Sequence, residues 1–180
     1  MLNLAFYAAL IIFFSKSLLR HPLVKSNVDD FIGESKFHPV IPDPRHGDPT
    51  FNADSIKRVI YCTGQVYFAL EKYRETQCIT DTAITRVEQL HPFPWQEVHD
   101  NLQQYPNAWD IVWCQEESVN DGPWAFSRTR LETIFDTTDH HRGRRLRFAG
   151  RPATPSVATG FASEHQAQEA ALLEEAFQVS

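Results

Sequence analysis

Two adjacent glutamates, Glu116 and Glu117, close an apolar run that begins at residue 110. Carboxylate pairs perform acid and base catalysis when both face one substrate. On a strand, however, neighbouring side chains point to opposite faces, so these two cannot face each other in the manner of a glycosidase pair. We therefore expect one of them to accept hydrogen bonds from backbone or arginine groups at a domain seam.

The turn Cys62-Thr63-Gly64-Gln65 follows another apolar run and precedes a predicted helix. Such a turn could hold an anion on the N-terminus of that helix. It lacks the three-glycine spacing of a dinucleotide fingerprint and the eight-residue phosphate loop. An ordinary connection between a strand and a helix is the better interpretation.

Histidines and hydroxyl side chains form no complete catalytic or metal-binding motif. The eight histidines make neither HxxxH nor HxH, and the arginines beside His140 and His141 would repel a divalent ion. We interpret that stretch, 137–147, as a solvated loop or as a basic docking surface. Ser156, Thr159 and Ser163 precede His165 without a GxSxG motif, and Ser163 with Gln166 is typical of a helix cap. We predict no catalytic, cofactor-binding or metal-binding residues.

The composition is that of a folded domain with an acidic surface. The 180 residues carry a net charge of −6, which argues against nucleic acid as a partner. The three cysteines are an odd number without a CxxC pair, which indicates reduced thiols, most simply buried ones.

Short β-branched runs and amphipathic segments alternate four times from residue 58 onward. We expect strands at 58–62, 82–90, 110–117 and 146–150, each followed by a helix at 65–74, 95–105, 123–135 and 162–177. This order predicts an α/β fold in three layers, with a mostly parallel sheet and helices on both faces. The four prolines within 38–49 predict an extended crossing segment in place of a helix.

The carboxyl ends of parallel strands meet at one edge of a sheet, where α/β proteins place their ligands. Five polar side chains lie at or near these predicted ends: Arg86, Glu88, Gln89, Glu116 and Arg151. We expect them to cluster and to form a domain or subunit seam.

An apolar run at residues 5–14, AFYAALIIFF, opens the sequence. It is about half the length that a helix needs to cross a bilayer, and its flanks show neither a signal nor another targeting peptide. We interpret it as a buried strand, with a membrane-tethered segment as the alternative.

Six strings at the predicted strand ends and turns are specific in sequence and order. They are SKSLLRHP (15–22), KRVIYCTGQVY (57–67), EQLHPFPW (88–95), YPNAWDIVWCQEE (105–117), GPWAF (122–126) and GRPATPSVATG (150–160). In this order and spacing the chain, over about residues 9 to 178, resembles the C-terminal domain of the E1 component of 2-oxoglutarate dehydrogenase.

The resemblance implies a transketolase C-terminal domain-like fold within an enzyme that uses thiamine diphosphate and magnesium. That enzyme oxidatively decarboxylates 2-oxoglutarate in the citric acid cycle and succinylates the lipoyl group of E2. The implied partners are the other E1 domains, a second E1 subunit, E2 and E3. The implied location is the mitochondrial matrix in a eukaryote or the cytoplasm in a bacterium, without a membrane or nucleic acid partner.

The family's GDG…N stretch and its GPEHSS segment have no match in the chain. We therefore expect the isolated chain to hold no cofactor and to be inactive, serving as a structural and dimer-forming domain. The implied organisation is a foreign or artefactual start at 1–8, a remnant strand of the pyrimidine-binding domain plus connector at 9–50, and the C-terminal α/β domain at 51–180. The alternative is a stand-alone interaction or nucleotide-binding α/β module.

Some bacterial relatives carry an acetyl-CoA pocket on this domain, built from a lysine, a glutamine and two arginines. Lys36 and Gln89 match the first two, but Gln96 and Glu97 stand at the arginine positions. Without these cations the CoA phosphates lose their anchors, so we do not expect the effector to bind.

Overall fold

The computed structural model describes residue 11 and residues 15–178. The chain divides into two compact units, Met1–Ser35 and Lys36–Ser180, and each is described by itself.

The first unit contains two short 3-10 helices among its described residues, η1 (Lys16–Arg20) and η2 (Val28–Phe31). The amide of Asn27 donates a hydrogen bond of 2.8 Å to the carboxylate of Asp30 at the start of η2. The apolar run at 5–14 lies outside the described residues except for Ile11, so the predicted strand stays a prediction. None of the described helices has the length and apolar character to cross a membrane.

The second unit is built on a five-stranded sheet in the order β1-β3-β2-β4-β5. The strands are β1 (Val40–Ile41), β2 (Arg58–Cys62), β3 (Thr82–Val87), β4 (Asp110–Ser118) and β5 (Arg147–Arg151). β1 pairs with β3 antiparallel, and the other pairs are parallel. The predicted fold class is confirmed, although β3 ends three residues earlier than expected.

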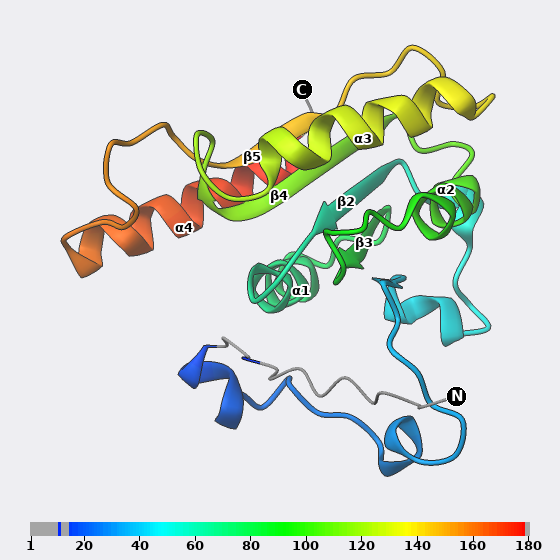
Figure 1. The fold of residues 1–180 in the computed structure, drawn as a ribbon, viewed down its shortest axis with the longest axis horizontal. Helices are drawn as coiled ribbons and strands as arrows, with labels where there is room; N and C mark the ends of the chain where they lie inside the picture. The colour runs from blue at the N-terminus through cyan, green and yellow to red at the C-terminus, as the bar shows by residue number, and fades with distance from the viewer. Residues whose placement is uncertain (1–10, 12–14, 179–180) are drawn as a thin grey trace, which may run out of the picture. The chain divides into compact units, whose positions relative to one another are not determined.

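Four helices cover both faces of this sheet (Figure 1). They are α1 (Val66–Thr76), α2 (Trp95–Gln103), α3 (Trp124–Thr137) and α4 (Ala162–Phe177). The side chains of α2 and α3 pack on Val59, Tyr61 and Trp113, while those of α1 and α4 pack on Ile60 and Val112. Alternate residues of each strand therefore feed two separate cores.

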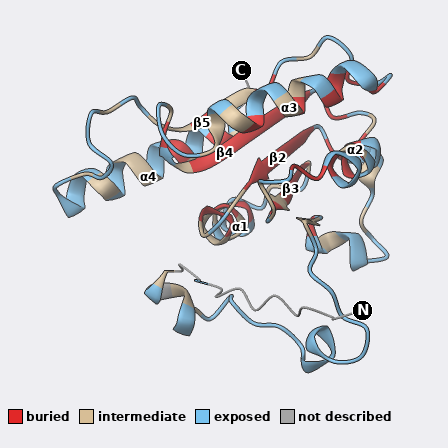
Figure 2. Ribbon diagram, in the orientation of Figure 1, coloured by how far each residue is buried: buried red, intermediate tan, exposed pale blue. Residues whose placement is uncertain are grey.

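The central strands are buried on both faces (Figure 2). Every residue of β2 is buried, as are the first six residues of β4. A continuous run of β-branched and aromatic residues suits such a position because no side of the strand meets water. The run RVIYC therefore forms a central strand, β2, with the bounds that the sequence predicts.

The proline-rich segment differs from the expectation. Residues 38–49 contain β1 and one 3-10 helix, η3 (Pro44–Gly47), and a further 3-10 helix, η4 (Ala53–Ser55), follows them. Pro44 occupies the first position of η3, where the missing N–H is tolerated, and the carboxylate of Asp43 accepts the amide of Arg45 at 3.0 Å. The prediction of an extended segment without a helix was wrong for this reason.

Asp43 also ties this segment to the sheet. Its buried carboxylate accepts hydrogen bonds from the Arg74 guanidinium and, at 2.8 Å, from the Ile84 amide. Burial raises the pKa of this carboxyl, but the hydrogen bond from Arg45 and the charge of Arg74 outweigh it, so the pKa lies below its ordinary value. Within the predicted connector, β1 and Asp43 thus contact the sheet of the second unit.

A second ion network closes the amino edge of the sheet, where β2, β4 and β5 begin. The carboxylate of Asp110 accepts Arg58 Nε at 2.6 Å and Arg147 Nη2 at 3.0 Å. Both arginines also donate to the last carbonyls of α4: Arg58 to Gln178 at 2.9 Å and Arg147 to Glu175 at 2.7 Å. Three separate strands and the end of α4 are thereby joined.

Two local expectations fail. Cys62 and Cys114 are buried as predicted, but Cys78 is exposed and adopts a φ of 53° just after α1. The stretch 137–147 is not a uniformly solvated loop, since Thr138 and His141 are buried and Arg147 belongs to the Asp110 network.

Candidate functional site

The carboxyl edge of the sheet carries the candidate site. Because β2 to β5 run parallel, their C-terminal ends lie at the same edge. Arg86 is the penultimate residue of β3, and Glu88 and Gln89 follow that strand. Glu116 lies near the end of β4, and Arg151 ends β5. The structure places all five side chains singled out from the sequence at this edge.

These residues separate into two groups. At the end of β3, Arg86 forms an ion pair with Glu88 at 3.6 Å and lies 4.4 Å from the ring centroid of Tyr67. The side-chain amide of Gln89 donates to the Pro92 carbonyl at 2.7 Å. The side chains of this group are thus engaged within the group itself. The remaining pair, Glu116 and Arg151, lines a cavity at the ends of β4 and β5.

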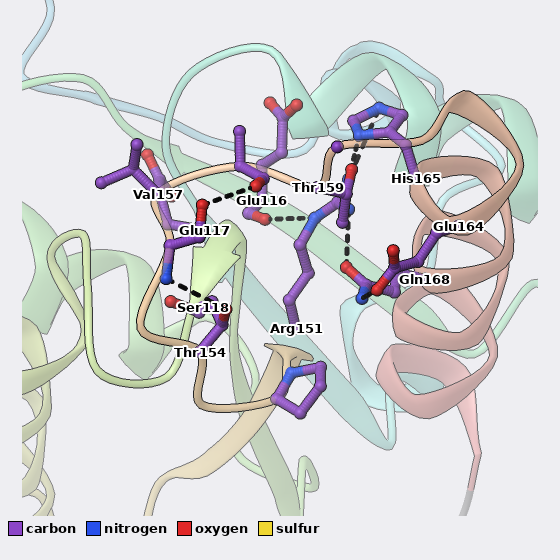
Figure 3. A pocket seen from close by; sticks show the side chains of 14 residues that line it. Glu116, Glu117, Ser118, Arg151, Thr154, Val157, Thr159, Glu164, His165 and Gln168 are labelled. Carbon is purple, nitrogen blue, oxygen red and sulfur yellow. Dashed lines mark hydrogen bonds between the residues drawn. The ribbon is translucent and has the colours of Figure 1, made fainter.

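A cavity of about 380 Å³ opens beside the ends of β4 and β5 (Figure 3). Its walls are the end of β4, the loop 152–161 that follows β5, and the first turns of α4. Glu117 and Glu164 add exposed carboxylates to the lining. The site is therefore formed by the end of β4 and by three segments that follow one another in the chain: the end of β5, the loop 152–161 and the start of α4.

Arg151 occupies the centre of this cavity and is held from three sides (Figure 3). Its Nε donates to the Glu116 carbonyl at 2.8 Å, its Nη1 to Gln168 Oε1 at 2.9 Å, and its Nη2 contacts His165 Nδ1 at 3.1 Å. A guanidinium bonded in this way is fixed in position. It joins β5 to β4 on one side and to α4 on the other.

Glu116 is oriented by a neighbour from a different strand end. Its carboxylate accepts a hydrogen bond of 2.5 Å from Gln65, the residue before α1. The predicted donors were backbone or arginine groups, whereas the Glu116 carboxylate accepts from the Gln65 side chain and Arg151 donates to the Glu116 backbone carbonyl. The domain seam stays a prediction. Glu117 is exposed and faces the cavity from the adjacent position.

The hydroxyl side chains near His165 are not arranged as a nucleophile and base. Ser156 Oγ donates to the Ala158 carbonyl at 2.9 Å, and His165 contacts Arg151. Ser163 lies inside the first turn of α4, whose N-cap is Phe161 without a side-chain hydrogen bond. The predicted Ser163 cap was therefore wrong.

Gln115 is a positioning residue that sequence reasoning missed. It is fully buried, accepts Trp113 Nε1 at 3.0 Å, and donates to the carbonyls of Ser118 and Asp121 at 2.9 and 2.8 Å. These bonds shape the turn after β4, and the pairing of β4 with β5 is irregular between Cys114 and Ser118, the part of β4 that contains Gln115. The available signal was a glutamine inside an otherwise apolar strand, because a buried amide needs several partners.

The lining offers no free cationic group to a diphosphate that lacks its metal ion. Glu116, Glu117 and Glu164 outnumber the single guanidinium of Arg151, which is already bonded to protein groups. An anionic ligand would meet repulsion from these carboxylates. Over the described part of the chain there is also no group of three His, Cys, Asp or Glu side chains that could hold a metal ion.

The two residues that match the bacterial effector pocket lie in the same unit. Lys36 is exposed, and the backbone amide of Gln89 donates to the Pro39 carbonyl at 3.1 Å. Gln96 and Glu97 are exposed on the first turn of α2. Gln96 and Glu97 carry no positive charge, and the expectation that the effector does not bind stays a prediction.

Comparison with known proteins identifies the family. The model described as "2-oxoglutarate dehydrogenase C-terminal" matches residues 25–177. The chain is 44% identical over 173 residues to the mitochondrial 2-oxoglutarate dehydrogenase of Schizosaccharomyces pombe, covering 95% of this chain and 17% of that protein. It is 42% identical over 172 residues to the 2-oxoglutarate dehydrogenase E1 component of Cupriavidus necator, covering 96% of this chain and 17% of the relative. The chain thus spans about a sixth of the length of these relatives.

A solved structure shares the fold. A split gene transketolase, described as an inactive beta4 tetramer, matches with a TM-score of 0.51 at 8% identity, over 79% of this chain and 42% of that chain. The transketolase C-terminal domain-like architecture expected from the sequence is confirmed. The five-stranded sheet agrees with the fold expected from the sequence, and the family match covers residues 25–177. The chain belongs to the 2-oxoglutarate dehydrogenase C-terminal family.

Proposed function

We propose that this chain serves as the structural, association-forming C-terminal domain of a 2-oxoglutarate dehydrogenase E1 component. The whole E1 would use thiamine diphosphate and magnesium to decarboxylate 2-oxoglutarate and to succinylate the lipoyl group of E2. The chain's own part is to present its carboxyl edge to the other E1 domains and to a second E1 subunit. E2 and E3 join at the level of the complex, in the mitochondrial matrix or the bacterial cytoplasm according to the source.

The state of Arg151 is the observation that carries this proposal. In α/β folds the carboxyl edge is the usual ligand site, yet here its central cation is bonded to the Glu116 carbonyl, to Gln168 and to His165. Arg86 is likewise paired with Glu88. Polar groups that are already bonded to other protein groups support a seam between domains and argue against a cofactor site.

Cofactor binding provides the first test. The chain is titrated calorimetrically with thiamine diphosphate in the presence of magnesium, and no saturable heat is expected at micromolar cofactor. The chain should also release no CO₂ from 2-oxoglutarate. Saturable binding or CO₂ release by the chain alone would contradict the proposal.

Association provides the second test, and it distinguishes this function from a stand-alone module. The rest of the E1 polypeptide is produced as a separate chain and mixed with this one. We expect a stable complex by light scattering and a gain in 2-oxoglutarate-dependent CO₂ release over the companion chain alone. A chain that stays monomeric and leaves the companion unchanged would favour an independent interaction module.

A further inference from the structure

Two buried thiols lie side by side in the middle of the sheet. In the parallel pairing of β2 with β4, Cys62 is the direct partner of Cys114. Both side chains belong to the core that α1 and α4 cover, so they point to the same face. Neighbouring strands lie about 4.7–4.9 Å apart, and disulfides join Cα atoms separated by about 4.4–6.8 Å. The register therefore places the two Cα atoms at a separation that a disulfide can span. The Cys62 thiol donates to the Thr85 carbonyl of β3 at 3.8 Å, so it must rotate toward β4 to bond with Cys114.

The surroundings keep both thiols reduced and protonated while the core is closed. Each side chain is fully buried. Burial raises the pKa of Cys114 to about 12 and, with the neighbouring Cys114, raises that of Cys62 well above its ordinary value. The thiolate is the reactive form of cysteine, so oxidation requires that water and oxidant first reach the pair.

Helix α4 is the element whose displacement would admit them. Leu172 and Ala176 of α4 pack in the same core as the thiols, and Glu175 lies close enough to influence Cys114. α4 packs mainly on β5, an edge strand, and on β4. The buried residues of α4 are only Leu172 and Ala176, and an element with few buried apolar side chains is a typical site of local opening.

We propose that Cys62 and Cys114 are a redox site that a hydroperoxide oxidises to an intrachain disulfide when α4 opens. This inference does not depend on the proposed function, since it concerns the core and not the carboxyl edge. The exposed Cys78 lies outside this core and takes no part.

The chemistry balances with the hydroperoxide as the two-electron oxidant. One cysteine loses its proton and attacks the O–O bond, which breaks to give a sulfenic acid and one molecule of water from hydrogen peroxide. The second sulfur then attacks the sulfenyl sulfur, the S–O bond breaks, and a second water leaves with the remaining proton. Two thiols are oxidised to one disulfide, and one peroxide is reduced to two waters.

Peptide mapping of the full chain tests the site directly. The folded protein is treated with hydrogen peroxide, its remaining thiols are alkylated, and it is digested with trypsin. Cys62, Cys78 and Cys114 then fall in three different peptides, 59–72, 75–86 and 87–128. We expect a linked 59–72/87–128 species in a monomeric chain that has lost two hydrogen atoms in mass, reversed by dithiothreitol.

Three variants sharpen the result. Cys78→Ser is the matched control and should leave the linkage unchanged, whereas Cys114→Ser should abolish it. Leu172→Ala, which loosens the cover, should accelerate linkage several-fold while circular dichroism stays that of the folded protein. Free Cys62 and Cys114 after peroxide treatment, or linkage only in urea-unfolded chains, would overturn the proposal. An unchanged rate in Leu172→Ala would overturn the route through α4.

Discussion

The two edges of the sheet use the same residue types for opposite purposes. At the amino edge Arg58 and Asp110 are buried. Arg58 and Arg147 both bond to the carboxylate of Asp110 and to backbone carbonyls at the end of α4. At the carboxyl edge Arg151 is only partly buried beside an open cavity, and Glu117 is exposed. Charged side chains are buried and paired at the amino edge, whereas charged side chains at the carboxyl edge are accessible to solvent.

This difference separates stability from association. A buried charge costs free energy unless it is paired, so the amino edge must be complete before the unit is stable. Exposed carboxylates contribute little to folding because water already solvates them. Charges at the carboxyl edge can therefore be changed to suit a partner at little cost in stability, whereas charges at the amino edge cannot.

Removing the central carboxylate of the amino edge should give the largest effect. Asp110→Asn leaves the charges of Arg58 and Arg147 without their carboxylate partner. Because breaking a buried ion pair costs about 3–5 kcal/mol, we expect the free energy of unfolding to fall by about that much. Urea denaturation followed by circular dichroism measures the change.

The matched control is Glu75→Gln, which removes an exposed carboxylate on α1. It should leave the urea midpoint almost unchanged. If Asp110→Asn were as mild as this control, the amino edge would not be the stabilising one and the comparison would fail.

Sequence patterns predict the two edges unequally. The carboxyl edge follows from strand periodicity, because each polar residue lies at or near the end of its own strand, as Glu116 does on β4 and Arg151 on β5. The amino edge depends on partners 52 and 37 residues apart, Arg58 and Arg147 with Asp110. Strand periodicity carries no information on such pairings, so the sequence predicts a strand at 146–150 but not the bond of Arg147 to Asp110.

The cavity was foreseeable only in part. Strand ends locate Arg151, but its contacts with His165 and Gln168 depend on how α4 returns across the edge after a ten-residue loop. Gln65 lies 51 residues from Glu116 and meets it only because β2 and β4 are neighbours. Strand order, which a single sequence does not specify, decided these contacts.

A smaller effect is expected at Asp43, the other buried carboxylate that faces arginines. Asp43→Asn should lower the free energy of unfolding at neutral pH by about 2 kcal/mol, less than Asp110→Asn because Arg74 keeps Glu71 at 2.6 Å. The folded pKa of Asp43 lies below its ordinary value. Its contribution is therefore complete above about pH 4, the unfolded pKa, and is lost as the pH falls through the folded pKa.

Unfolding of both proteins at several pH values between neutrality and strong acid measures this dependence. The difference in free energy between the wild type and Asp43→Asn should be constant above about pH 4 and should shrink in more acidic solution. A difference that grows on acidification would mean that the carboxyl is destabilised in the fold, contrary to its contacts with Arg45 and Arg74.

The smallest change in stability is expected at the carboxyl edge, and there it should be accompanied by a change in association. Glu117→Gln with Glu164→Gln removes the two exposed carboxylates of the cavity and leaves the bonds of Arg151 in place. Stability should change by no more than about 0.5 kcal/mol per site.

If this edge is the seam, charge complementarity there sets the rate and specificity of association. Binding to the companion E1 chain should weaken, and the wild-type complex should also weaken as salt is raised. Interferometry at two ionic strengths separates the outcomes, with the double variant Glu75→Gln, Glu97→Gln, at two other exposed carboxylates, as the control of equal charge change. Equal binding by all three proteins would place the seam elsewhere on the unit.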